Sequence, residues 1–392
     1  MSARKQIAIL GSTGSVGKQV LDVVRSSQNR FQVKLLSANE NAELLMLQAL
    51  EFKPRAIIIG NENKVEFLDK KLANSPVQVF GGITYLNKVS SITDFDLLVN
   101  ALSGINGLHP SLDAISQGKS IAMANKESMV AGGSLIMDAA HDQKTSVIPV
   151  DSEHSAVFQC LQGESFKAIK KIFLTASGGP FRGMRREELN HATVEQALRH
   201  PNWNMGNKIS IDSATLANKG LEAIAAQWFF NLNQDQISII QHPQSIVHAL
   251  VQFTDGSIKA QMGVPDMRIP IHYALNYPER QSAETPVPDF SSSFSLDFEE
   301  IDINNYPDLM LALKAMEYGG NIPAAFNAAN EIAVYAFLNK KIAFTQIAEI
   351  NKIVLKQIKK IVNPDFNEII KTDSASRKIA EDHIKTIQAL NR

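Results

Sequence analysis

The chain has 392 residues, of which 44% are hydrophobic and 20% are charged. This length exceeds one ordinary hydrophobic core, so we expect two or three domains. The 39 basic and 40 acidic residues nearly cancel, which argues against nucleic acid or a membrane surface as a partner. The single cysteine, Cys160, excludes an internal disulfide and a thiolate metal cluster, and it suits a reducing compartment.

The apolar run after Arg4 and Lys5 covers only residues 7–10 before Gly11. That run is far shorter than a signal-peptide core or a membrane span. We therefore expect a cytoplasmic protein.

The same run opens the most informative segment, because it reads as a strand followed directly by a glycine-rich turn. A helix over 18–25 and a second strand over 31–36 come next. A strand, a tight turn and a helix N-terminus together make a site for the pyrophosphate of a dinucleotide, with an ordinary structural turn as the alternative. The residues expected to contact the cofactor here are Gly11, Ser12, Thr13, Gly14, Ser15 and Val16.

Four regions follow from the patterns along the chain. Strand-like runs at 56–59, 77–80, 95–101, 120–122 and 146–150 alternate with helical segments, which predicts a Rossmann-like parallel sheet domain over 1–150. Residues 151–276 have runs at 246–253 and 257–262 that suggest an antiparallel open sheet in an α+β catalytic domain. The proline-rich stretch 277–307 reads as a linker. Helical periodicity at 308–318, 324–339, 345–361 and 374–390 predicts a C-terminal helical bundle over 308–392, with its lysines on a solvated face.

Asp151 and Glu153 follow the strand at 146–150, and on an extended backbone their spacing would send both carboxylates the same way. Two convergent acids indicate a hard divalent cation such as Mg²⁺ or Mn²⁺, with Glu222 as the candidate third ligand. A solvated acidic turn is the alternative for the pair taken alone.

Two segments, 175–182 and 210–215, place hydroxyl side chains beside flexible or helix-opening backbone, as phosphate sites do, and Lys219 lies close in sequence. Ordinary serine-capped turns are the alternative. Between them, the segment His200-Pro201-Asn202-Trp203 resembles a lid that folds an indole over a ligand, although Trp203 is also a common packing residue.

Taken in order, these motifs resemble one family, 1-deoxy-D-xylulose 5-phosphate reductoisomerase, over nearly the whole chain. The matching segments are residues 11–17, Asn125-Lys126-Glu127, Asp151-Ser152-Glu153-His154-Ser155, Ser177-Gly178-Gly179-Pro180-Phe181-Arg182, His200-Pro201-Asn202-Trp203, residues 208–222 and Pro265-Asp266-Met267-Arg268.

The resemblance implies an enzyme that rearranges a phosphorylated ketose and reduces the product with NADPH to 2-C-methyl-D-erythritol 4-phosphate, for isoprenoid precursors. It implies one Mg²⁺, Mn²⁺ or Co²⁺ held by Asp151, Glu153 and Glu222. Retro-aldol/aldol and α-ketol routes are both compatible with these residues. The implied catalytic residues are Lys126, Glu153 and His200, and the implied substrate contacts are Ser152, Ser177, His200, Trp203, Ser213, Asn218, Lys219 and Glu222.

For NADPH, the resemblance adds Asn39, Asn125, Lys126, Glu127 and Gly206, and it implies a homodimer. Glu40 departs from the family pattern after the second strand, because an acid there favours the ribose hydroxyl of NAD over the 2′-phosphate of NADP. Either Glu40 points to solvent while Ser37 and Asn39 meet the phosphate, or the preference shifts to NADH.

Two other functions are possible: an NADP-dependent reductase of semialdehyde dehydrogenase type, for which Cys160 is the one available nucleophile, and a non-catalytic dinucleotide sensor.

Overall fold

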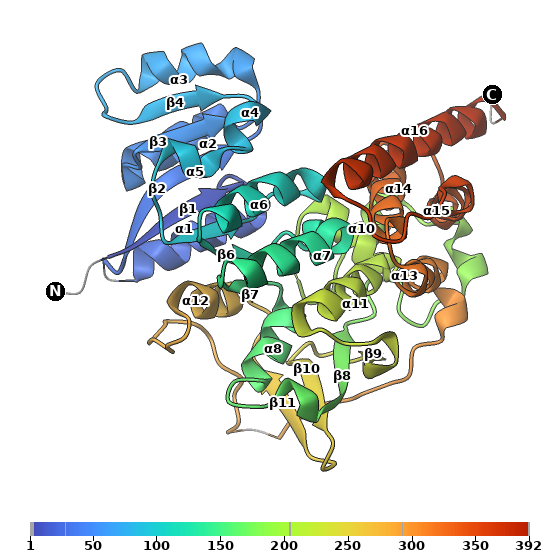
Figure 1. Ribbon diagram of the computed structural model, residues 1–392. Helices are drawn as coiled ribbons and strands as arrows, with labels where there is room; N and C mark the ends of the chain where they lie inside the picture. The colour runs from blue at the N-terminus through green and yellow to red at the C-terminus, as the bar shows by residue number, and fades with distance from the viewer. Residues whose placement is uncertain (1–3, 28, 204, 292, 391–392) are drawn as a thin grey trace. The chain divides into compact units, whose positions relative to one another are not determined.

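The computed structural model describes residues 4–390 except 28, 204 and 292 (Figure 1). Contacts divide the chain into two compact units. Unit 1 contains Met1–Ser128, Ser134–Ser155 and Met267–Pro286, and unit 2 contains Met129–Gly133, Ala156–Asp266 and Val287–Arg392. These boundaries follow compactness, whereas the four regions above follow sequence character, and those regions stay a prediction.

Unit 1 is built on a seven-stranded parallel sheet with the order β4-β3-β2-β1-β5-β6-β7. The Rossmann-like architecture predicted from the alternating runs is confirmed. The strands are β1 Lys5–Leu10, β2 Phe31–Ala38, β3 Ala56–Ile59, β4 Gln78–Gly81, β5 Leu97–Asn100, β6 Ser120–Met123 and β7 Val147–Pro149.

β1 lies in the middle of the sheet. Its last four side chains, from Ile7 to Leu10, have no solvent exposure. Such an unbroken apolar run is typical of a parallel strand covered on both faces. β2 and β5 flank it, so the chain order reverses at β1, and ligands bind at the carboxyl ends of strands beside such a point.

Helices connect these strands and cover the sheet. They are α1 Ser15–Ser26, α2 Ala42–Phe52, α3 Val65–Lys71, α4 Ile83–Leu86, α5 Val89–Ile92 and α6 Leu108–Ser116, with the 3-10 turns η1 Glu62–Lys64 and η2 Gly104–Gly107. α12, Arg268–Asn276, comes from late in the chain yet lies beside α1, and Lys5 Nζ donates to Leu275 O at 3.0 Å (Figure 1). α7 Lys126–Asp142 and α8 Ser152–Cys160 contain residues of both units.

Unit 2 contains a four-stranded sheet of β8 Ile169–Ala176, β9 Ile237–Gln241, β10 Val247–Phe253 and β11 Ile258–Met262, in the order β11-β10-β8-β9. β10 is antiparallel to β8 and β11, but β8 and β9 are parallel. The two runs that predicted antiparallel pairing, 246–253 and 257–262, form β10 and β11 and do pair antiparallel, and the parallel β8–β9 pair makes the whole sheet mixed. The chain returns from β8 to β9 through α10 Asn207–Ala214 and α11 Ala217–Phe230, and such a helical crossover permits parallel pairing.

Shorter elements complete this part of unit 2. They are η3 Phe166–Ala168, η4 Arg186–His191, α9 Val194–Ala197 and η5 Gln234–Gln236. The predicted linker at 277–307 contributes η6 Ile303–Asn305 and an isolated bridge between Glu299 and Gln241.

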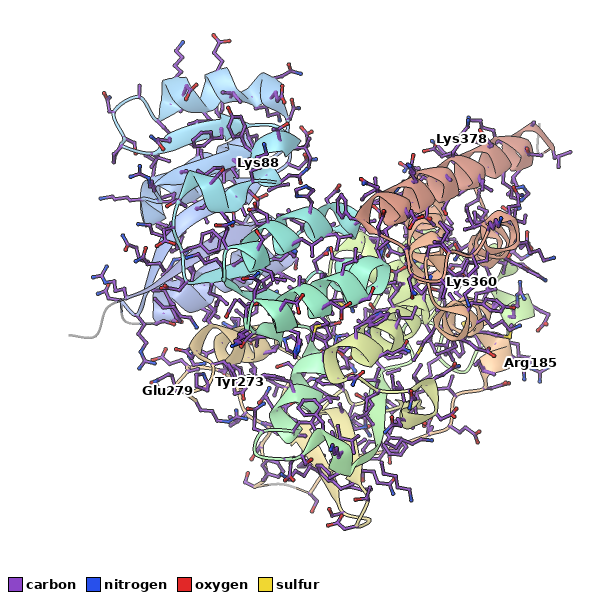
Figure 2. All side chains as sticks on the ribbon, viewed as in Figure 1. Lys88, Arg185, Tyr273, Glu279, Lys360 and Lys378 are labelled. Carbon is purple, nitrogen blue, oxygen red and sulfur yellow. The ribbon has the colours of Figure 1, made fainter. Side chains whose placement is uncertain are left out.

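Four helices end the chain: α13 Pro307–Tyr318, α14 Ile322–Leu338, α15 Gln346–Gln357 and α16 Phe366–Leu390. α16 begins earlier than the apolar periodicity predicts, because Asp365 and Glu368 cap each other reciprocally, with Glu368 N donating to Asp365 Oδ1 at 2.8 Å. Lys360, labelled in Figure 2, and its neighbouring lysines are exposed, as expected for a solvated face. None of the helices in the described part of the chain combines the length and the apolar run needed to cross a membrane.

Candidate active site

The glycine turn after β1 has the geometry that a dinucleotide site requires. Gly11 has φ of +78°, and a Cβ there would lie 2.4 Å from Ala101 O. A Cβ on Gly17 would lie 2.2 Å from Gly11 O, so the turn and the first turn of α1 pack too closely for any side chain. Gly14 is the N-cap of α1, and no described side chain caps that end. The first N–H groups of α1 are thereby free of a competing cap, as anion binding needs.

The predicted contacts in this turn divide by exposure. Gly14 and Ser15 are exposed, and Thr13 and Val16 are half-buried. The Ser12 side chain is buried instead, where its hydroxyl is 2.7 Å from Gln48 Oε1 and 3.1 Å from Ser37 O. Ser12 therefore holds the shape of the turn with its side chain and with its backbone, since Ser12 N donates to Ser37 O at 2.8 Å and Gln48 Nε2 donates to Ser12 O at 2.9 Å.

Asn125-Lys126-Glu127 forms the start of α7 beside the end of β5. The Asn125 side chain caps the helix by accepting from Ser128 N at 3.0 Å, and its amide donates to Glu127 Oε2 at 3.3 Å. Lys126 is buried, with its ammonium 2.5 Å from Asp151 Oδ2. A buried lysine on a carboxylate is rare unless the pair has a function or is well hydrogen-bonded.

Asp151 comes just after β7, but the chain does not stay extended beyond it, because Ser152 is the first residue of α8. The extended-backbone reason for pairing Asp151 with Glu153 is therefore wrong. Ser152 Oγ donates to Glu153 Oε2 at 2.6 Å, and Ser152 N donates to Asp151 Oδ1 at 3.2 Å. The turn into α8 thus orients both acids by local hydrogen bonds.

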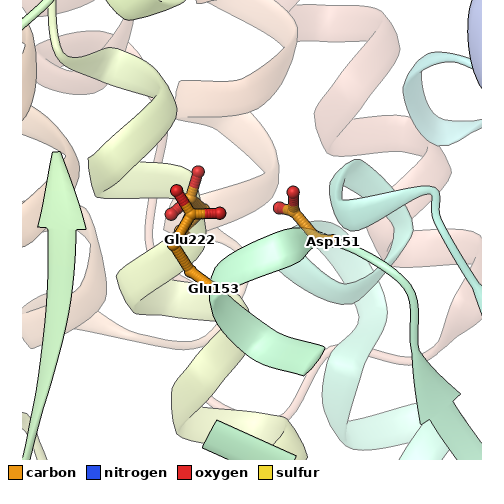
Figure 3. Close-up of side chains that lie close together, drawn as sticks. All are labelled: Asp151, Glu153 and Glu222. Carbon is orange, nitrogen blue, oxygen red and sulfur yellow. The ribbon is translucent and has the colours of Figure 1, made fainter. Parts of the chain in front are cut away.

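Figure 3 shows Asp151, Glu153 and Glu222 with their carboxylates close together. One oxygen from each lies within 4.8 Å of the others. Three negative charges this close repel one another unless cations offset them. Their oxygens are the donors that a hard divalent ion prefers.

In unit 2, Glu222 is held by two residues of its own helix. Asn218 Nδ2 donates to Glu222 Oε1 at 2.6 Å, and Lys219 Nζ donates to Glu222 Oε2 at 2.5 Å. Lys219 and Glu222 are both buried. Leu216, at φ of +56°, forms the sharp entry into α11, and Ser213, the last residue but one of α10, has a half-buried side chain. Ser213 therefore lies on one side of the junction between α10 and α11, and Asn218 and Lys219 lie on the other.

His200 has a defined tautomer. Its Nδ1 accepts from the N–H groups of Asn202, at 3.2 Å, and Trp203, at 3.0 Å, so the proton resides on Nε2. Nε2 lies 3.0 Å from Ser177 Oγ and donates to it. Burial, with the nearby Lys219 charge adding to it, lowers the pKa of His200 to about 4. The ring is neutral near pH 7 and presents one N–H beside Ser177.

The segment after His200 is anchored by a contact that the sequence reasoning missed. Asn202 Nδ2 donates to Pro243 O at 2.6 Å and to Ser245 Oγ at 2.9 Å. Trp203 is half-buried, with its ring centroid 6.1 Å from that of His248. Gly206 is the exposed N-cap of α10. An Asn between a Pro and a Trp carries no local signal for such a long-range contact, so only the fold reveals it.

Comparisons with known proteins agree along the chain. A family model described as 1-deoxy-D-xylulose 5-phosphate reductoisomerase matches residues 7–133, and two C-terminal domain models of the same enzyme match 147–230 and 262–379. A Porphyromonas gingivalis protein named 1-deoxy-D-xylulose 5-phosphate reductoisomerase is 48% identical over 378 residues, covering 96% of this chain and 98% of that protein.

Two solved structures have the same fold. One, a reductoisomerase of this name from Zymomonas mobilis in complex with NADPH, has a TM-score of 0.90 and 38% identity, covering 97% of this chain and 99% of that one. The other, a DOX-P reductoisomerase in complex with NADPH, fosmidomycin and magnesium, has a TM-score of 0.93 and 38% identity, covering 98% of this chain and 99% of that one.

Proposed function

The chain belongs to the 1-deoxy-D-xylulose 5-phosphate reductoisomerase family, and we propose that the residues described above form its active site. The protein converts 1-deoxy-D-xylulose 5-phosphate to 2-C-methyl-D-erythritol 4-phosphate with NADPH and a divalent metal, in isoprenoid precursor synthesis. The observation that carries the assignment of residues is the group of three carboxylates, Asp151, Glu153 and Glu222.

We assign the metal to these three acids because their oxygens suit a hard cation and lie within 4.8 Å of one another. A relative's structure contains magnesium, and we propose that Mn²⁺ or Co²⁺ also serves. When bound, the ion acts as a Lewis acid on the substrate's carbonyl and hydroxyl oxygens. Lys126 stabilises the Asp151 carboxylate through its ion pair, and Ser152 orients Glu153 and faces the substrate's middle.

We assign the substrate phosphate to Ser177, Ser213, Asn218, Lys219 and His200, all of which lie in unit 2. Two cues support this pocket. The neutral His200 ring offers its Nε2–H beside Ser177, and Lys219 supplies the positive charge. A phosphate would accept hydrogen bonds from these groups and draw the Lys219 ammonium toward itself, since charge-assisted bonds to phosphate are among the strongest in proteins. A fosmidomycin complex of a relative accords with a small-molecule ligand.

Trp203 and its neighbours act as a lid in this proposal. An indole over the substrate excludes water, which strengthens the charge interactions beneath it. Asn202 then fixes where the lid closes, through Pro243 and Ser245. Lys126, Glu153 and His200 are the proposed catalytic residues.

For NADPH, the glycine turn fits the pyrophosphate because a side chain at Gly11 or Gly17 would collide with backbone atoms. When bound, NADPH supplies the hydride for the reduction. We propose that the turn from Gly11 to Val16 holds the pyrophosphate at the uncapped start of α1, since anions bind at such helix starts. The remaining proposed cofactor contacts are Asn39, Asn125, Lys126, Glu127 and Gly206.

The two alternative functions, a semialdehyde dehydrogenase and a dinucleotide sensor, account for fewer of these structural features. A semialdehyde dehydrogenase mechanism needs an accessible thiolate, whereas Cys160 is the buried last residue of α8. A protein that only binds a dinucleotide would leave the buried Lys219–Glu222 pair and the group of three acids without an explanation.

We further propose a homodimer. β11 is an edge strand with Ile258 exposed, and the same unit exposes the side chains of Val287, Phe290 and Phe294. Exposed apolar side chains and an open strand edge are features that association would cover. We also propose a cytoplasmic location, because the one cysteine is a free, buried thiol, which is compatible with a reducing compartment. Cell fractionation would test the location, and light scattering would test the dimer.

The decisive experiment follows absorbance at the NADPH band while 1-deoxy-D-xylulose 5-phosphate is added, with and without Mg²⁺ or Mn²⁺. We expect oxidation of NADPH that requires the metal. Turnover that survives complete metal removal and is abolished by Cys160→Ser would instead favour the thiol mechanism. Dinucleotide binding without turnover of the sugar phosphate would favour the sensor.

A further inference from the structure

Unit 1 carries a charge of the wrong sign where NADPH needs a cation. Glu40 is the second residue after β2, and an acid at this place hydrogen-bonds the ribose hydroxyl in NAD sites, whereas NADP sites use a basic residue. Residues 39–43 read Asn, Glu, Asn, Ala and Glu, with neither Arg nor Lys among them. Because the protein uses NADPH, the compensating charge must come from another segment.

The turn after β3 is that segment. Gly60 N donates to Ala38 O at 2.8 Å, and Asn61 N donates to Asn39 O at 2.9 Å, so the two chains stay paired beyond the ends of their strands. A Cβ at Gly60 would lie 2.3 Å from Asn39 Oδ1, so the turns pack directly against each other. Lys64, which ends η1, is the one basic residue in 60–64.

Glu40 is engaged by this second turn. Asn61 Nδ2 donates to Glu40 Oε2 at 2.9 Å, and Lys64 Nζ donates to the Glu40 backbone oxygen at 2.8 Å. The ammonium is also 3.7 Å from Glu40 Oε2, and the Lys64 and Glu40 side chains are 40% and 62% exposed. The Glu40 carboxylate is therefore hydrogen-bonded to Asn61, and the Lys64 ammonium lies beside the Glu40 backbone, two residues beyond the end of β2.

Ser37 does not provide an alternative donor for a phosphate. It is buried, its hydroxyl oxygen accepts from Gly11 N at 3.1 Å, and its carbonyl accepts from Ser12 N at 2.8 Å. Its polar groups therefore hold the glycine turn in place. Of the two residues first considered for the 2′-phosphate, only Asn39 is exposed.

We propose that Lys64 is the specificity-determining residue that makes this chain select NADPH over NADH, by pairing with the 2′-phosphate while Asn61 holds the Glu40 carboxylate aside. An ammonium has three donors, so Lys64 can keep its bond to the Glu40 carbonyl and still bind a phosphate oxygen. A phosphate monoester carries a charge of about −1.5 to −2, more than the carboxylate it would displace.

The proposal rests on the use of NADPH, and its test separates the two. In Lys64→Ala, we expect the ratio of kcat/KM for NADPH to that for NADH to fall roughly 10- to 100-fold, through KM for NADPH. The NADH parameters and kcat at saturating NADPH should not change. Lys64→Arg should keep the ratio, and Glu40→Gln should raise it. Lys70→Ala, which removes an exposed lysine of α3, is the matched control.

A second readout needs no turnover. Adenosine 2′,5′-bisphosphate and AMP serve as probes of the ribose end, and their dissociation constants are measured calorimetrically. Lys64→Ala should weaken only the bisphosphate. Equal weakening of both probes, or an unchanged ratio in a wild-type protein that prefers NADPH, would overturn the role of Lys64. A wild-type protein that prefers NADH would instead overturn the use of NADPH itself.

Discussion

A buried carboxyl in the C-terminal helices should control how stability depends on pH. Asp308 on α13 has no effective solvent contact, and Asn351 Nδ2 donates to its Oδ1 at 2.8 Å. Asn351 Nδ2 also lies 3.2 Å from Asn330 Oδ1, and Asn330 Nδ2 donates to Asp212 Oδ1 at 2.7 Å. Burial is the main cause that raises the pKa of Asp308 to about 7, and the nearby Asp212 charge adds to it.

The sign and size of the effect follow from linkage. Since the folded pKa lies above the unfolded one, the folded state binds more protons between about pH 4 and pH 7. The stabilisation is complete below the unfolded pKa and is lost as pH rises through the folded pKa. A rise from 3.8 to about 7 corresponds to about 4 kcal/mol in total, and to about 1.4 kcal/mol for each pH unit within that window.

The substitution Asp308→Asn removes this titration and keeps the side-chain oxygen that accepts from Asn351. Between pH 5 and pH 7, the wild-type protein should therefore lose about 2 to 3 kcal/mol relative to the variant. Urea unfolding at each pH measures this difference, and the tryptophan fluorescence of unit 2 reports the transition. Asp382→Asn is the control, because Asp382 is exposed and its pKa is lowered by Lys385, so it does not titrate in this range. Parallel pH profiles for wild type and Asp308→Asn would refute the reasoning.

Three further predictions concern the site. Glu222→Gln should reduce turnover at least about 1000-fold, because the proposed metal site loses one of its three carboxylates, while NADPH affinity measured by fluorescence stays within error. Equal loss of turnover and of NADPH affinity would contradict the proposed separation of the metal and cofactor sites. In NMR titrations, His200 should titrate near pH 4 and move upward when inorganic phosphate binds, since an added anion favours the charged ring; an unmoved pKa would place the phosphate elsewhere. Asn202→Ala loses two hydrogen bonds and should raise KM for the sugar phosphate about 5- to 10-fold, with circular dichroism unchanged; an unchanged KM would show that the anchor does not position the lid.

Local patterns in the sequence determined much of this protein. The apolar run at Ile7–Leu10, the glycines after it and the alternation of strands and helices predicted the parallel sheet and the dinucleotide turn, because each depends on neighbours a few residues apart. The motifs also identified Asp151, Glu153 and Glu222 as the candidate metal ligands. The extended backbone that was expected to align the first two carboxylates is not present. The start of α8 at Ser152, with its own hydrogen bonds, replaces the expected extended chain.

Only the tertiary structure decided which partner each polar group has. The Lys126–Asp151 pair, the Asn202 anchor on Pro243 and Ser245, the Lys64 contact with Glu40 and the chain from Asp308 to Asp212 all join residues that are distant in sequence. Periodicity and turn propensity describe a segment by itself, whereas burial, pKa and hydrogen-bond partners depend on which segments the folded chain brings together. For that reason the sequence identified the chemistry, and the fold determined which residues surround it.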